Sequence, residues 1–83
     1  MQQQDYELLT KFGRRIKELR TKQNKSLNNF SFNSELLTSA TVSRIENGLV
    51  DLKFSTLIKL ANALDMKPEE VLHDFDFKYE TDL

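Results

Sequence analysis

Residues 38–48, TSATVSRIENG, carry the marks of one short helix with two unlike faces. Thr38 can accept a hydrogen bond from a backbone N–H of the first turn, and Gly48 can take the left-handed conformation that often follows a helix. Val42 and Ile45, three residues apart, predict an apolar face directed at a core. The opposite face carries small side chains and an arginine: Ser39, Ala40, Ser43 and Arg44. Exposed helices more usually carry Lys and Glu there, so this face is suited to lying flat against another molecule.

Apolar spacing and helix-capping residues elsewhere predict four further helices, and hence an all-α fold. Leu8, Phe12, Ile16 and Leu19 recur at helical intervals in the first of them. Ser26 and Ser55 are expected N-caps, as is Asp5, and Pro68 suits a first helical position. The expected helices span residues 5–23, 26–34, 38–47, 55–64 and 68–75.

Length and composition exclude several classes of protein. Eighty-three residues make one small domain, and with no cysteine and a single histidine the chain can hold no thiolate metal site. No apolar run approaches the ~20 residues of a membrane span, and the first residues, MQQQDYE, do not resemble a signal peptide. No nucleophile–base arrangement or glycine-rich phosphate loop is visible. We expect a soluble cytoplasmic protein with no catalytic residues, metal, cofactor, membrane contact or small-molecule ligand.

The formal net charge of −1 conceals an uneven distribution of charge. Residues 1–25 carry seven Lys/Arg against three Asp/Glu, a charge of +4. Residues 49–83 carry four Lys against eight Asp/Glu, a charge of −4. A chain with this polarity can present one positive face to phosphate groups, although an asymmetry of this size is also common in proteins that bind no nucleic acid.

Three segments, in a fixed order along the chain, resemble a known family. SRIENG at 43–48, with IKELR at 16–20 upstream and STLIKLANALDMKPEEVL at 55–72 downstream, is similar to the Cro/phage-repressor (XRE-type) helix-turn-helix domain. The similarity runs from about Phe12 to Phe75. It implies a five-helix, lambda-repressor-like DNA-binding domain over residues 1–75, followed by a tail at 76–83. In that family the helix matching 38–47 is the recognition helix, which enters the DNA major groove.

The resemblance also implies roles for individual residues. Arg20 would form a structural ion pair with Glu46 at the far end of the recognition helix. The side chains expected at base edges are Ser39, Ala40, Ser43 and Arg44, since arginine can grip guanine, serine can bond either kind of edge, and a methyl group suits thymine. The residues expected at or near backbone phosphates are Asn28, Asn29, Thr38, Thr41, Asn47, Lys53 and Ser55.

The sequence departs from the family pattern at two places. The residue after the cap of the second helix is usually Gln, which touches phosphate, but here it is Leu27. The turn from Glu35 to Thr38 is one residue longer than usual and lacks its glycine. Beyond Gly48 the apolar residues alternate, which permits a strand, whereas the family implies a loop whose residues Leu49, Leu52 and Phe54 close the core.

The function expected from this resemblance is sequence-specific transcription regulation, as a repressor or an activator. One small domain makes few contacts, so a homodimer reading an inverted-repeat operator is expected. The alternative is a protein-interaction module, such as an antitoxin or accessory subunit that binds a protein partner, which the acidic tail with Phe77 and Tyr79 favours. RNA binding is a weaker alternative, because the exposed aromatic pair needed for base stacking is lacking.

Overall fold

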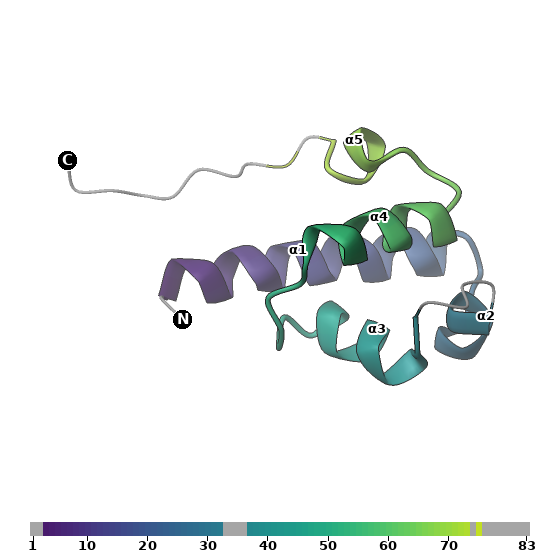
Figure 1. The fold of residues 1–83 in the computed structure, drawn as a ribbon, viewed down its shortest axis with the longest axis horizontal. Coiled ribbons are helices and arrows are strands. Elements are labelled where there is room, and N and C mark those ends of the chain that lie inside the picture. Colours follow the sequence, from purple (N-terminus) through teal and green to yellow (C-terminus); the bar gives the residue numbers. More distant parts are fainter. Residues whose placement is uncertain (1–2, 33–36, 74, 76–83) are drawn as a thin grey trace.

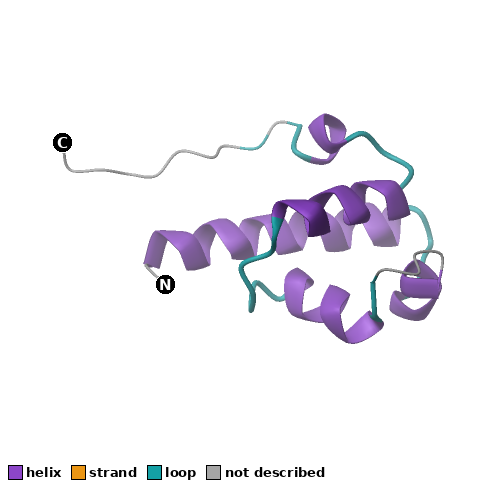
Figure 2. Cartoon of the chain, in the orientation of Figure 1, coloured by secondary structure: helices purple, strands orange, loops and turns teal. Residues whose placement is uncertain are grey.

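The computed structural model describes residues 3–32, 37–73 and 75. This part of the chain contains five helices and no strand, so the all-α expectation is confirmed (Figures 1 and 2). The helices are α1 (Gln3–Lys22), α2 (Leu27–Phe32), α3 (Ser39–Glu46), α4 (Phe54–Ala63) and α5 (Pro68–Val71). None of them is both long and apolar enough to cross a membrane.

The long helix α1 is the base on which the others are arranged. Helix α3 packs against both α1 and α2, and α5 packs against α4. In Figure 1, α3 and α5 lie on opposite sides of α4. The outward side of α3 therefore faces away from α5.

Most helix boundaries lie one residue from those predicted, and the start of α1 and the end of α5 lie further away. Helix α1 begins at Gln3, so Asp5 lies in its first turn instead of capping it. Helix α4 begins at Phe54 because the Lys53 carbonyl already accepts bonds from two backbone N–H groups, so Ser55 is not the cap. Helix α5 ends at Val71, short of the predicted residue 75. The predicted end of the second helix at 34, the long turn and the tail aromatics lie outside the described residues.

The core is built from the apolar residues that the helical periodicity selects. The largest fully buried side chains come from all five helices and from the residue that follows α4: Phe30, Ile16, Ile45, Leu60, Leu64, Val42 and Val71. The expectation that Leu49 and Phe54 close the core is wrong, since they are 67% and 77% exposed. Leu52, which was also expected there, packs against the core, and so does its neighbour Val50. The physical reason is that Phe54 becomes the first residue of α4, where its side chain points outward.

Glycine at two positions lets α1 approach the end of α3 closely. A Cβ at Gly13 would lie 2.2 Å from the carbonyl oxygen of Ile45 and 2.7 Å from that of Glu46, and both are backbone atoms. At Gly48, which has φ +69°, a Cβ would lie 2.8 Å from Oγ1 of Thr10. Any larger residue at position 13 would therefore push α3 away from α1, and this explains a glycine inside a helix despite its low propensity.

A buried ion pair joins the same two helices. Arg20 Nε lies 2.6 Å from Oε2 of Glu46, and Nη2 donates to Oε1 at 3.0 Å. The two side chains are only 8% and 5% exposed. The hydrogen bond to Glu46 raises the pKa of Arg20 above its usual value, against the opposing effect of burial. A third bond, from Nη1 to the carbonyl of Lys25 at 2.7 Å, ties in the loop after α1.

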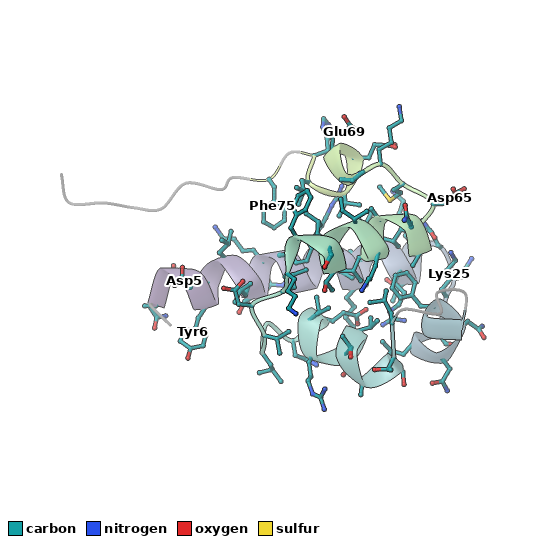
Figure 3. All side chains as sticks on the ribbon, viewed as in Figure 1. Asp5, Tyr6, Lys25, Asp65, Glu69 and Phe75 are labelled. Atoms are coloured by element: carbon teal, nitrogen blue, oxygen red, sulfur yellow. The ribbon has the colours of Figure 1, made fainter. Side chains whose placement is uncertain are left out.

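Other polar side chains at α1 and just after it bond the ends of distant helices. Arg15 Nε donates to the Val71 carbonyl at 3.1 Å, which engages an oxygen left free at the end of α5. Gln23 Nε2 donates to the Leu64 carbonyl at 2.8 Å, and Lys25 Nζ to that of Ala63 at 3.1 Å, at the end of α4. Figure 3 labels Lys25 near the end of α4.

Breaking the buried ion pair from one side should destabilise the protein strongly. Glu46→Ala leaves the Arg20 guanidinium without its partner and should lower the free energy of unfolding by ~3–5 kcal/mol, measured by urea denaturation with circular dichroism. The double variant Arg20→Met/Glu46→Leu should recover most of that loss, because no charge stays buried. Glu18→Ala, at an exposed acid on α1, serves as the control and should change stability by ~0.5 kcal/mol at most. A loss below about 1 kcal/mol for Glu46→Ala would contradict the structural role of the pair.

Candidate nucleic-acid interface

The start of α3 is fixed by its own threonines. Thr38 is the N-cap, with an extended backbone (φ −96°, ψ 156°), and its Oγ1 accepts from the Thr41 backbone N–H at 3.1 Å. The Thr38 hydroxyl also lies 2.9 Å from Oγ1 of Thr41 and donates to it. The cap predicted from the sequence is therefore formed, and both hydroxyls lie at the N-terminal end of the helix.

The end of α3 is closed by backbone bonds that need glycine. The Gly48 N–H donates to the Ile45 carbonyl at 3.0 Å, and the Leu49 N–H donates to the Arg44 carbonyl at 2.9 Å. This bond pattern with a left-handed residue between the helix and its exit is a Schellman motif. Asn47 is the C-cap, and its Nδ2 donates to the Ser43 carbonyl at 2.8 Å. The length of α3 is thus defined at both ends.

The two faces of α3 separate as its sequence predicts. Val42 and Ile45 are 0% and 2% exposed and belong to the core. On the other side Ala40 and Arg44 are exposed, and Ser39 and Ser43 are half-buried. We call these last four residues the outer face of α3. Apart from the single long side chain of Arg44, this face is nearly smooth, so another molecule can approach its backbone closely.

The residues expected at phosphates come from three elements around α3. On α2, Asn28 and Asn29 are exposed. The Asn29 backbone N–H donates to Oγ of Ser26 at 3.1 Å, which is the hydrogen bond expected of Ser26 as an N-cap. Lys53 and Ser55 are exposed at the start of α4. Hydrogen bonds join Thr38 to Thr41 and Asn47 to Ser43, but no such bond in the described part of the chain connects Lys53 or Ser55 to α3.

Some of the basic side chains of the first 25 residues make contacts within the protein. Three of its seven basic side chains, those of Arg15, Arg20 and Lys25, bond groups of the fold itself. Lys11, Arg14, Lys17 and Lys22 remain exposed on α1. The roles of Arg15, Gln23 and Lys25 were missed from the sequence because their partners are 56, 41 and 38 residues away and no local pattern marks them.

The chemistry available at this surface is binding. The described residues contain no group of three or more His, Cys, Asp or Glu side chains that could hold a metal ion. His73 is exposed beyond α5 and does not belong to the outer face of α3. The interface offers hydroxyl, amide and guanidinium groups together with one methyl surface, which are the groups that read base edges and phosphates.

Comparison with known proteins agrees with this arrangement. A helix-turn-helix family model matches residues 16–71. Among solved structures, the chain is similar to the restriction-modification controller protein C.AhdI from Aeromonas hydrophila. The two share 38% sequence identity over 80% of this chain and 94% of that one, with a TM-score of 0.74. Among curated proteins, no sequence matches.

The matched region contains the ion pair, both helix caps and the whole of α3, and it extends over most of the chain. Its five helices agree with the fold of the solved neighbour. The family is non-enzymatic, so the expectation that the protein is not an enzyme is confirmed. The chain belongs to the helix-turn-helix family of the Cro/phage-repressor type and is a DNA-binding transcriptional regulator.

Proposed function

We propose that the protein regulates transcription by reading an inverted-repeat operator through the major groove as a homodimer. The observation that carries this proposal is the outer face of α3, which is smooth, accessible and backed by a rigid apolar core. The major groove is about 12 Å wide and admits one α-helix. A helix held by a buried ion pair on one side and by α2 on another meets the groove at a fixed angle.

The proposed base readers are the four residues of the outer face. Arg44 is the specific reader, because it is exposed on α3 and a guanidinium can donate two parallel bonds to guanine. Ala40 offers a methyl surface to thymine, and Ser39 and Ser43 can bond either kind of base edge. Small neighbours let the backbone of α3 come near enough for these short side chains to reach.

The phosphate contacts that we propose surround this face. Thr38 and Thr41 lie at the start of α3 and Asn47 at its end, while the remaining residues flank it from α2 and from the start of α4. Such contacts fix the position of a protein on the duplex and carry little sequence information. The set proposed here is Asn28, Asn29, Thr38, Thr41, Asn47, Lys53 and Ser55.

Two copies would give the specificity that one domain lacks. A two-fold axis would place two α3 helices about 34 Å apart, one turn of DNA, which requires an inverted-repeat site. The chain shares 38% identity with a restriction-modification controller protein. We therefore propose that its operator lies upstream of restriction-modification genes, and that the protein acts in the cytoplasm. Selection of binding sites from a random DNA pool would reveal the half-site and its spacing.

Arg44→Ala should weaken binding to the selected operator by about 1–3 kcal/mol per half-site and leave binding to random DNA nearly unchanged, as measured by fluorescence anisotropy. Arg44→Lys is the matched control because it keeps the charge and loses the planar fork. It should lose nearly as much specific affinity as Arg44→Ala. If lysine restores operator binding, or if both DNAs lose affinity equally, Arg44 contacts phosphate only.

Lys53→Ala should lower affinity evenly for operator and random DNA, because it removes a phosphate contact. The slope of log K against log salt concentration should become shallower by about one unit per bound copy. Lys67→Ala is the control, since Lys67 is exposed just before α5, and α5 lies on the side of α4 away from α3 (Figure 1). Equal slopes for the two variants and the unchanged protein would remove Lys53 from the interface.

One gel-shift experiment, on random DNA at low salt, distinguishes the proposed function from the alternative of a protein-interaction module. Retardation supports DNA contact, because nonspecific binding is dominated by phosphate interactions. Absence of retardation, together with a stable complex with a protein partner, would support the interaction module instead.

A further inference from the structure

The leucine that follows α3 has a fixed backbone and an exposed side chain. Leu49 is 67% exposed, and it comes directly after Gly48, which is buried. A Cβ at Gly48 would lie 2.9 Å from the Cα of Thr10, so the turn that carries Leu49 lies close against α1. Val50, the next residue, packs against the core. The backbone of Leu49 is therefore held on both sides, although its own apolar side chain does not belong to the core.

A backbone hydrogen bond places Leu49 beside Arg44. The Leu49 N–H donates to the Arg44 carbonyl at 2.9 Å, and this bond spans the whole Schellman motif. Helices that end in this motif frequently carry an apolar contact between the two residues that this bond joins. At the end of α3 those residues are Leu49 and Arg44. Arginine can supply the methylene groups of its stem for such a contact while its charged end stays in water.

No acidic residue is spaced to hold the Arg44 guanidinium in an ion pair along α3. The residues three and four positions from it are Ala40, Thr41, Asn47 and Gly48. These are the spacings at which side chains meet on a helix surface. A long side chain loses rotational freedom when it binds a base, and this loss lowers affinity. A contact that already orders the arginine in the free protein removes part of that cost.

We propose that Leu49 is a positioning residue for DNA recognition, and that its side chain packs along the alkyl stem of Arg44 and directs the guanidinium outward to a guanine. This inference rests on the proposed role of Arg44 as a base reader. Leucine suits the task because it offers no hydrogen bond that competes with the base for the guanidinium. A carboxylate at position 49 would also attract Arg44, but it would repel the DNA phosphates. Leu49 contributes through Arg44 and makes no contact of its own with DNA.

The first test observes the contact in the free protein, without DNA. Protein with ¹³C-labelled leucine and arginine should show nuclear Overhauser effects between the methyl groups of Leu49 and the methylene protons of Arg44. Leu49→Ala should raise the mobility of the Arg44 side chain, measured by ¹⁵N relaxation at its Nε. The melting curve should stay unchanged, because position 49 is exposed. Absence of these Overhauser effects in the unchanged protein would overturn the proposal.

The second test is a double-mutant cycle on the selected operator, measured by fluorescence anisotropy. Leu49→Ala should weaken operator binding about threefold to tenfold per half-site, since one long side chain must then be ordered on binding. Its binding to random DNA should not change. In the Arg44→Ala background the same replacement should change operator affinity by less than about twofold, because no stem is left to position. Equal losses in the two backgrounds would show that Leu49 acts independently of Arg44, which overturns the proposal.

Two further replacements separate apolar packing from side-chain shape. Leu49→Met keeps an apolar side chain of similar size and should retain operator affinity within about twofold. Leu49→Asn keeps the branched shape but replaces the methyl groups by an amide, and it should lose as much affinity as Leu49→Ala. If asparagine supports operator binding as well as leucine does, apolar packing on the Arg44 stem is not the cause, and the proposal fails.

Failure of this inference can be told apart from failure of the proposed function. If the contact between Leu49 and Arg44 is absent while Arg44→Ala still removes the preference for the operator, only the role of Leu49 is overturned. If the contact is present but Arg44→Ala leaves operator binding unchanged, the proposed base reader is wrong, and the role of Leu49 in recognition falls with it.

Discussion

A pair of buried opposite charges holds α3 against α1, the longest helix of the protein. The Arg20 guanidinium and the Glu46 carboxylate make two bonds, and Gly13 lets the backbones approach so closely that a single methyl group would overlap carbonyl oxygens. The ion pair and the close contact depend on each other, because a displaced α3 would leave both charges buried and unpaired, which is costly. The outer face of α3 therefore has one orientation relative to the rest of the fold.

Helix α1 organises the fold through polar bonds as well as through its apolar stripe. Arg15 bonds the end of α5, and Gln23 and Lys25, which follow α1, bond the end of α4. A domain of 83 residues has a small core, and buried apolar area alone is only marginally sufficient at this size. Side chains that satisfy helix-end carbonyls remove a cost that short helices otherwise carry. Basic residues that look like a DNA-binding surface in the sequence are thus partly structural.

Helical periodicity and local capping signals predict most of this fold. Val42 and Ile45 lie in the core and Thr38 caps α3, because these features depend on residues within one or two turns. The contacts that were missed are long-range: nothing near Arg15 in the sequence indicates a carbonyl 56 residues away. Phe54 was expected in the core because the family resemblance implies a core-closing loop there, yet its position at the start of α4 turns it outward. The residues of the DNA interface remain predictions, because their ligand is a second molecule.

The central claim is that the outer face of α3 is the surface that meets DNA. Titrating ¹⁵N-labelled protein with the selected operator duplex, and following each backbone amide by NMR, tests this claim for every described residue at once. The account predicts that the largest shifts fall on residues 39–44, with smaller ones at the starts of α2 and α4, and that the amides of α5 stay nearly unchanged. Shifts concentrated on α5, with residues 39–44 unaffected at saturating operator, would contradict it.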